Sequence, residues 1–347
     1  MALDADKQAE INGLRASSSP TRRATVAALE AVLYEPLPVL DHGFVRVIDY
    51  MGDDAAIVQA ARVSYGRGTK QVSNDRGLIN YLMRHRHTSP FEMCELKLHV
   101  KLPIFVARQW IRHRTANVNE YSARYSILDR EFYVPDAEYL QKQRDAKAFA
   151  SLETKSGQIA MLGLFDADSD AIAPQSTTNK QGREERPLEG DDAFGAADAI
   201  KRESQRAYTF YAKLLNEKAD GTPLDPNRPG VARELARVVL PLNTYTQMYW
   251  KVDLHNLLHF LRLRHDAHAQ YEIRAYAEVL FDLVHKWVPL TARAFGDYRL
   301  RSAELSATAL EAIRRRLAGE RVTRENSGLG AGEWRELLAL LPGLVEG

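Results

Sequence analysis

The strongest constraint on the fold is an alternating segment that ends at a proline. In residues 94–102 (CELKLHVKL), leucine and valine alternate with lysine and histidine. Side chains of a strand point alternately to its two faces, so this pattern predicts a strand with one buried face. Pro103 suits the first turn of a helix, where its missing N–H costs nothing. Residues 104–114 (IFVARQWIRHR) therefore predict a helix that carries the basic residues 112–114 at its end.

The rest of the chain alternates between strand-like and helix-like segments. Strands are predicted at residues 44–50 and 244–252, which are rich in β-branched and aromatic side chains. Apolar periodicity and capping signals predict further helices at residues 25–33, 55–63, 77–85, 198–215, 231–240, 254–263 and 267–287. This order predicts a structure of mixed α and β elements, and it leaves the sheet topology open.

Composition divides the chain into a long main part and three appendages. Residues 1–35 are predicted to be an N-terminal arm and a short helix, because the first twenty residues are polar and turn-rich. Residues 36–300 form the main domain, interrupted at about 146–197 by an insert rich in Ser, Asp, Gly, Pro and charge. Residues 301–347 are predicted to be a helical tail with two short amphipathic helices.

Charge and cysteine content exclude several classes of protein. The 47 Lys and Arg residues against 46 Asp and Glu give a formal net charge of +1, so no global basic field points to nucleic acid. The single cysteine, Cys94, cannot form an internal disulfide or a CxxC metal site. No signal sequence or membrane-length apolar stretch is present. We therefore expect a soluble, cytoplasmic protein that does not bind a membrane.

The most unusual composition lies in residues 108–125 (RQWIRHRTANVNEYSARY). Four arginines and a histidine occur there with only Glu120 as counter-charge. Basic side chains at a helix C-terminus complement the helix dipole, which accounts for two of these cations. Arginine also offers planar, bidentate donors that match phosphate and carboxylate, and Asn and Ser add neutral donors. The stretch favours an anion pocket for a phosphorylated small molecule.

A second polar cluster precedes the alternating strand. Residues 84–92 (RHRHTSPFE) contain His87, Ser89 and Glu92. Taken alone, this cluster is explained more simply by a solvated helix end and a turn at Pro90 than by a binding site.

A third cluster, residues 253–272 (DLHNLLHFLRLRHDAHAQYE), raises the alternative of a zinc hydrolase. His255 and His259 are four residues apart and share one helix face. The metalloprotease signature, however, has a glutamate directly after its first histidine, where this chain has Asn256. No thiolate is available at this position either. We therefore assign no metal ligands.

Motifs for a serine nucleophile and for phosphate-binding loops are missing from the sequence. Ser122 has no GxSxG elbow and no evident activating His–Asp pair, so we interpret it as a hydrogen-bond donor. The sequence contains neither a Rossmann glycine fingerprint nor a P-loop. A bound nucleotide must therefore be held by side chains.

The Arg-rich stretch resembles the RHR-x-x-S-x-N-x-x-S-x-R signature of the flavin-dependent thymidylate synthase family. The matching residues are Arg112, His113, Arg114, Asn119, Ser122 and Arg124, and Asn117 stands where the signature has its first Ser. The segments HTSPFE and LRLRHDAHAQYEIR also resemble this family, and the resemblance spans about residues 44–295 apart from the insert.

The resemblance implies an α+β fold with a mixed or antiparallel sheet, packed helices and a helical portion. It implies a homotetramer whose active sites are built from several subunits. Members of this family convert dUMP to dTMP with FAD as redox cofactor, NADPH as reductant and methylenetetrahydrofolate as one-carbon donor.

The resemblance also assigns site residues. FAD would be contacted by Ser64, His87, Ser89, Glu92, Arg112, His113, Arg114, Glu120, Asp253, Leu254, His255 and His259. The dUMP site would be lined by Gln109, Trp110, Ile111, Arg112, Glu120, Tyr121, Ser122, Ala123, Arg124, Arg237 and Arg264. Within this set, Arg124 and Arg237 would clamp the phosphate.

Arg264 is the expected catalytic residue. Placed against N3 and O4 of uracil, its charge would favour the N3-deprotonated form and push electron density towards C5. C5 would then attack the methylene carbon and reduced flavin would supply hydride, so Cys94 is not needed as a nucleophile. The alternative is an RNA- or nucleotide-binding module. A net charge near zero and the lack of an RNP-type aromatic signature weigh against it, so no nucleic acid is required.

Overall fold

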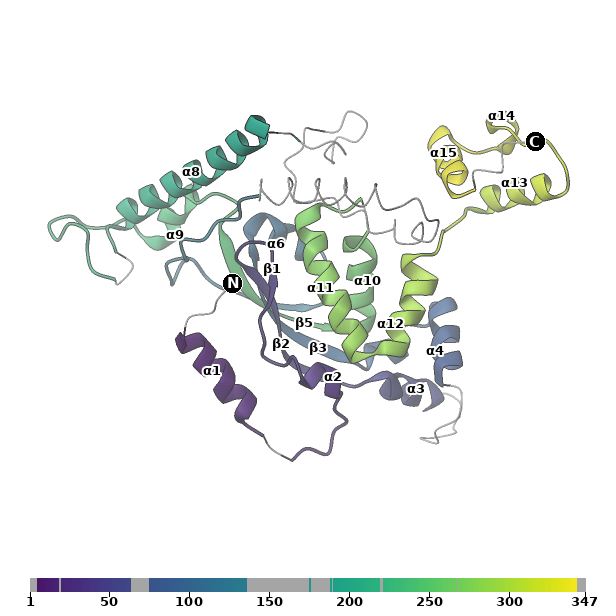
Figure 1. Cartoon of the computed structure of the whole chain (residues 1–347), viewed down its shortest axis with the longest axis horizontal. Helices are drawn as coiled ribbons and strands as arrows, with labels where there is room; N and C mark the ends of the chain where they lie inside the picture. Colours follow the sequence, from purple (N-terminus) through teal and green to yellow (C-terminus); the bar gives the residue numbers. More distant parts are fainter. Residues whose placement is uncertain are drawn as a thin grey trace. The chain divides into compact units, whose positions relative to one another are not determined.

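A five-stranded antiparallel sheet organises the larger part of the chain (Figure 1). Its spatial order is β1 (Leu37–Val39), β2 (Gly43–Met51), β3 (Glu95–Pro103), β5 (Tyr245–Asp253) and β4 (Asn117–Glu120). β3 is the predicted alternating strand: its leucines and Val100 are fully buried, while Lys97 and His99 on the other face stay partly exposed. The fold class predicted from the resemblance is confirmed.

The computed structural model divides into two units, Met1–Arg293 and Ala294–Gly347. The predicted N-terminal segment 1–35 belongs to the first unit, and the second unit begins seven residues before the predicted tail. The structure describes residues 5–18, 20–63, 75–135, 175, 188, 190–218, 221–266 and 268–341. Most of the predicted insert 146–197 therefore lies outside the described residues.

Three helices that follow β3 and β5 cover the sheet. α10 (Leu254–Arg264) packs on β5, and α11 (Tyr271–Trp287) packs on β1 and β2. α6 (Ile104–Trp110) packs against both central strands and against α11. Figure 1 shows α10 and α11 crossing in front of the strands. α6 begins after Pro103 as predicted, but it ends at Trp110, so the basic residues 112–114 follow the helix instead of forming its last turn.

An aromatic cluster fills the space between α6, α10, α11 and the sheet. The Trp110 ring lies 5.2 Å from Trp250, 4.7 Å from Phe260 and 5.9 Å from Tyr276 between ring centroids. All four side chains are at most 1% exposed. Because each large aromatic side chain buries 150–250 Å² in typical proteins, this cluster fixes the three helices on the sheet.

The remaining helices of the first unit lie around this core. They are α1 (Ala5–Ala16), α2 (Ala27–Glu30), α3 (Asp54–Val63), α4 (Asp75–Arg84), α5 (Ser89–Glu92), α8 (Gly190–Leu215), α9 (Arg233–Ala236), a 3-10 turn (Arg237–Val239) and α12 (Pro289–Phe295), which crosses the boundary between the units.

Four local predictions were wrong. Residues 5–16 form α1 instead of a turn-rich arm, and Arg15 donates to the carbonyl oxygens of Ala31 and Leu33 at 2.9 and 3.1 Å. α8 begins at Gly190, inside the predicted insert and eight residues before the predicted start. The helix predicted at residues 231–240 is reduced to α9 and a 3-10 turn. The helix predicted to begin at residue 267 begins at Tyr271.

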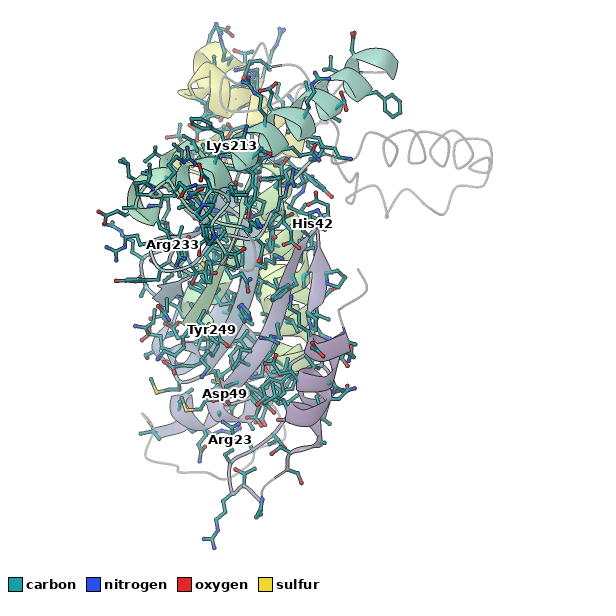
Figure 2. All side chains as sticks on the ribbon, turned by 90° about the vertical axis from the view of Figure 1, so that its left-hand side faces the viewer. Arg23, His42, Asp49, Lys213, Arg233 and Tyr249 are labelled. Atoms are coloured by element: carbon teal, nitrogen blue, oxygen red, sulfur yellow. The ribbon has the colours of Figure 1, made fainter. Side chains whose placement is uncertain are left out.

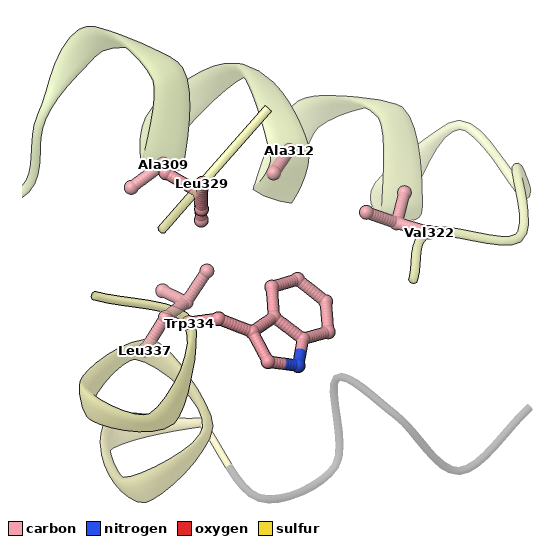
Figure 3. Close-up of a cluster of buried hydrophobic side chains, with 6 residues drawn as sticks. All are labelled: Ala309, Ala312, Val322, Leu329, Trp334 and Leu337. Atoms are coloured by element: carbon pink, nitrogen blue, oxygen red, sulfur yellow. The ribbon is translucent and has the colours of Figure 1, made fainter. Parts of the chain in front are cut away.

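The second unit has its own small core. It contains a π-helical turn (Gly296–Leu300), α13 (Ala307–Leu317), α14 (Arg324–Ser327) and α15 (Ala331–Leu340). Figure 3 shows the cluster that joins α13 to α15, made of Ala309, Ala312, Val322, Leu329, Trp334 and Leu337. The predicted helical tail is therefore present, with one short helix more than predicted. In neither unit does any helix of the described residues have the length and apolarity needed to cross a bilayer.

We expect Gly43→Ala to lower the free energy of unfolding by about 1–3 kcal/mol or more, because neighbouring atoms already occupy the space that its Cβ would need. A Cβ there would lie 2.0 Å from the Tyr276 hydroxyl oxygen, 2.7 Å from the Val39 carbonyl oxygen and 2.9 Å from that of Lys101. Urea denaturation measures the change. Gly195→Ala in α8 is the control, since nothing lies within 4 Å of its Cβ position. We expect that variant to be neutral or more stable, and equal effects of the two substitutions would contradict the packing described.

Candidate active site

The guanidinium of Arg264 joins the end of α10 to the end of α6. Its Nε donates to His113 Nε2 at 3.2 Å, and its Nη2 donates to the Gln109 carbonyl oxygen at 3.2 Å. These two contacts use two of the five N–H groups that a guanidinium carries. The side chain is half-buried, and this burial lowers the pKa of Arg264 from its usual value. Arg264, His113 and Gln109 are called the Arg264 cluster below.

His113 must be neutral to accept this hydrogen bond. Burial, the nearby Arg264 cation and His259 together lower the pKa of His113 from 6.5 to about 4. Since Nε2 accepts the proton of Arg264, the ring proton of a neutral His113 is at Nδ1. The ring lies against Phe260 and His259 of α10, at centroid distances of 4.8 and 5.7 Å. The early Arg-rich stretch and the late His/Arg helix therefore meet within one chain, as the sequence hypothesis requires.

The second predicted cluster also approaches α10. Ser89 and Glu92 lie at the two ends of α5, which packs against α10 and α3. His87, Ser89 and Glu92 are exposed, and the His87 ring stacks on Tyr81 at 5.8 Å. Ser89 and Glu92 of α5 and His259 of α10 thus come from distant stretches of sequence and lie on two adjacent helices, and His87 lies just before α5.

Three of the predicted ligand residues have structural roles instead. Asp253 caps α10: its two carboxylate oxygens accept from the Asn256 backbone N–H at 2.9 Å and from the Asn256 side chain at 2.7 Å. The Trp110 and Leu254 side chains are fully buried in the core. The Leu254 N–H is also engaged, with the Cys94 carbonyl oxygen at 2.8 Å. The side chains of Trp110 and Leu254 therefore pack in the core, and their assignment to a ligand site stays a prediction.

The second half of the signature forms an edge strand and a turn. No strand is predicted at residues 117–120 from the sequence, but they pair with β5 as β4, because that strand offers its free edge. Glu120 accepts from the Thr246 hydroxyl at 3.0 Å, and the Tyr121 N–H donates to the Gln247 carbonyl oxygen at 2.8 Å. Pairing along β5 thus fixes where the following turn begins.

This turn, residues 121–126, is called the Arg124 turn below. The Ser122 carbonyl and hydroxyl oxygens accept backbone N–H groups of residues 124–126 within the turn. Arg124 is exposed, with its guanidinium 5.4 Å from the Tyr125 ring centroid. Arg233 of α9, labelled in Figure 2, donates to the Tyr125 carbonyl oxygen at 2.6 Å and pairs with Glu217 at 2.8 Å. That contact brings the segment of Arg237 next to the Arg124 turn.

The structure therefore places predicted site residues in two groups, the Arg264 cluster and the Arg124 turn. Arg112 and Arg114 are exposed next to the Arg264 cluster, and Ile111, Ala123 and His255 are half-buried. Ser64 lies outside the described residues. Sequence reasoning missed Arg233, for which no local signal exists. It also missed Gln270 and Glu272, which stand inside the quoted segment HAQYEIR but carried no assigned role.

The zinc alternative finds no support in the described ranges. Among these residues no group of three or more His, Cys, Asp or Glu side chains could hold a metal ion. Cys94 is buried beside the Asp53 carbonyl oxygen at 3.6 Å, and burial raises the pKa of its thiol to about 12. A thiol in this state is a poor nucleophile.

Comparison with known proteins identifies the family and the fold of the chain. The family model of thymidylate synthase complementing protein matches residues 46–290. The chain is 55% identical over 343 residues to a flavin-dependent thymidylate synthase from Gluconobacter oxydans, covering 99% of each chain. It is 56% identical over 336 residues to one from Ruegeria pomeroyi, covering 97% of this chain and 98% of the relative. The chain belongs to the flavin-dependent thymidylate synthase family.

A solved structure agrees with this assignment. The UMP/dUMP methylase PolB from Streptomyces cacaoi, bound with 5-Br UMP, is 31% identical with a TM-score of 0.56. The match covers 76% of this chain and 99% of PolB.

Replacing Arg264 by Ala should raise the pKa of His113 from about 4 towards 6.5, because a cation that opposes protonation is removed while part of the burial remains. NMR titration of the imidazole measures this shift. His99 is the control, since its pKa of about 4 results from burial, Arg46 and Lys101, and it should not move. An unchanged pKa of His113 in Arg264→Ala would contradict the Arg264 contact.

In the unaltered protein and in Arg264→Ala, lowering the pH from about 6.5 to 4 should reduce the free energy of unfolding. The reason is that His113 has a lower pKa in the folded chain, so the unfolded chain binds the proton first.

Proposed function

We propose that this chain converts dUMP to dTMP by reductive methylation, with FAD as redox cofactor, NADPH as reductant and methylenetetrahydrofolate as one-carbon donor. Membership of the flavin-dependent thymidylate synthase family supports the reaction class. The observation that carries the proposal is the Arg264 cluster, in which a half-buried guanidinium contacts the signature residue His113 and keeps free N–H groups.

Arg264 would bind the uracil ring and hold negative charge on it. A partly buried cation stabilises an anion more than an exposed one does, because less solvent screens it. Pairing with Arg264 would lower the pKa of uracil N3–H and increase the electron density at C5. The neutral state of His113 supports this role, because a protonated His113 could not accept the Arg264 N–H and its charge would repel the guanidinium from this position.

The residues present fit a flavin dinucleotide by their donor chemistry. Its pyrophosphate needs cations and hydrogen-bond donors, and His87, Ser89, Arg112 and Arg114 are all exposed. Glu120 and the histidines 255 and 259 complete the set of polar contacts that we propose. Asp253 caps α10 and would order the start of that helix beside the cofactor. Bound FAD would supply two electrons to the transferred carbon and recover them from NADPH.

The overall reaction balances without a protein thiol. The C5–H bond of uracil is replaced by a C5–CH₃ bond, and the proton from C5 is released. The two bonds between the methylene carbon and the folate nitrogens break, and this carbon gains a hydride equivalent (two electrons and a proton), so NADPH is oxidised. Each of the two nitrogens of tetrahydrofolate takes up a proton, so the reaction consumes one proton more than C5 releases. Cys94 takes no part, in agreement with its burial and the raised pKa of its thiol.

The phosphate of dUMP would lie between Arg124 and Arg237. Arg233 joins their two segments, and both arginines are exposed, so they are free to bind an anion. Exposed apolar side chains lie close to Arg237 in the sequence: Leu235 is 60%, Val238 70% and Leu242 65% exposed. Because large exposed apolar patches mark interaction surfaces, we propose that a second copy of the chain covers this surface. A homotetramer with shared sites would follow from such contacts.

We expect substitution of Arg264 to reduce turnover and substitution of Arg124 to weaken dUMP binding. We expect Arg264→Ala to retain flavin absorbance and to lose most dTMP formation, since uracil activation is removed. Arg124→Ala should raise the dUMP dissociation constant, by roughly 10-fold or more for a lost charged contact. Calorimetry with dUMP and a dTMP assay with NADPH measure both. Unchanged turnover of the first variant would exclude the activation role, and unchanged affinity of the second would exclude the phosphate contact.

Val238→Asp should shift the protein to smaller species in sedimentation velocity, because a charge placed in an apolar interface is left unpaired. The folded subunit should persist, since Val238 is 70% exposed in it. Leu317→Asp is a matched control, because this side chain is 82% exposed in the second unit. If Val238→Asp sediments like the unaltered protein, the proposed interface is wrong.

A further inference from the structure

A hydrogen-bonded chain of side chains begins next to Arg264 and runs into the core. The Gln109 side chain donates to Gln270 Oε1, and Gln270 Nε2 donates to Glu272 Oε2 at 2.8 Å. Glu272 Oε1 accepts from the Tyr133 hydroxyl at 3.2 Å. The Gln109 main-chain oxygen in turn accepts Nη2 of Arg264. Four residues from three distant segments are thus connected to the guanidinium.

Gln270 occupies a helix N-cap position, where a side chain ordinarily accepts a hydrogen bond from the first turn of the helix. It is the N-cap residue of α11, with φ −55° and ψ 136°, yet its side chain makes no capping hydrogen bond. Ser, Thr, Asp and Asn are the residues that cap helices well. The longer Gln270 side chain instead bridges two neighbours across the loop that follows Arg264. Its polar atoms are used for this bridge and not for starting the helix.

Glu272 is the buried end of this bridge. The residue is 6% exposed, and both of its carboxylate oxygens accept a hydrogen bond. A buried carboxylate is costly unless its hydrogen bonds are made, so Glu272 holds its donors in fixed positions. Tyr133, also buried, is tied by its backbone to Asn243 just before β5, at 2.9 and 2.8 Å. The chain therefore anchors the loop after Arg264 to the sheet.

We propose that Gln270 and Glu272 are positioning residues for Arg264. They fix Gln109 and the loop after α10, and so hold the guanidinium at the angle that pairs it with the uracil anion. This inference rests on the function proposed above. A guanidinium at the end of a helix would otherwise sample several rotamers, and misplacement by about 1 Å can cost about 100-fold in rate.

The test compares Gln270→Ala with the unaltered protein. Gln270 is exposed and does not cap α11, so the variant should fold. We expect kcat for dTMP formation to fall about 10-fold, with a much smaller change in the dUMP dissociation constant. Because a loosened Arg264 stabilises the N3 anion less, the pH at which kcat is half-maximal should move upwards. A role in stability alone would lower activity at every pH without moving the profile.

A double-variant cycle separates positioning from an independent role. On the Arg264→Ala background, Gln270→Ala should have no further effect on kcat, because it acts through Arg264. Glu272→Gln, which keeps the shape but loses one acceptor, should shift the pH profile in the same direction. Gln8→Ala is the control: this exposed glutamine of α1 bonds only to Asn12 in the described contacts, at 3.1 Å, and its loss should change nothing.

The outcomes distinguish this inference from the function on which it rests. If the unaltered protein forms no dTMP, the proposed function fails. If it does, but Gln270→Ala leaves kcat and the pH profile unchanged, the positioning role is wrong. Multiplicative effects of Gln270→Ala and Arg264→Ala would also overturn it.

Discussion

The antiparallel pairing of β3 with β5 is the constraint on which the rest of the structure depends. The two strands pair over nine residues each, from Glu95 opposite Asp253 to Pro103 opposite Tyr245. Each continues directly into a helix, so α6 and α10 begin at opposite ends of the same pair of strands. A nine-residue strand spans about 30 Å. Helices of seven and eleven residues span about 10 and 16 Å. Because α6 and α10 run towards each other, their C-terminal ends meet. This meeting places Arg264 beside Gln109 and His113.

Electrostatics at this meeting point follows from burial. Burial of His113, together with the nearby Arg264 cation and His259, lowers the pKa of His113, and the neutral imidazole accepts the guanidinium N–H. Among the described residues no carboxylate pairs with Arg264, so the positive charge of the arginine is not compensated by these contacts. A site with this charge is prepared for an anion, and the N3-deprotonated uracil that we propose is such an anion. The phosphate would require separate cations, which the Arg124 turn and the α9 segment provide.

The structure also shows that residues of one motif have different surroundings. Within the segment 253–272, Asp253 caps the helix, Phe260 packs in the aromatic core, and Arg264 reaches the site. These residue types alone would not distinguish the three roles. Position on the helix decides them, because residues at the start can cap, those facing the sheet are buried, and the last turn is free to extend.

The sequence by itself determined the two central strands, the helix after Pro103 and the family signature. Alternation and motif spacing are local properties, and they survive folding because the hydrophobic face must be buried in any arrangement. Only the tertiary structure decided that residues 117–120 become an edge strand, since a polar segment pairs wherever a free strand edge is offered. It alone placed Trp110 and Leu254 in the core and linked Gln270 and Glu272 to Arg264. The contacts that do this, such as Gln109 with Gln270 and Tyr133 with Glu272, join residues more than a hundred positions apart, and no local pattern encodes which of them will meet.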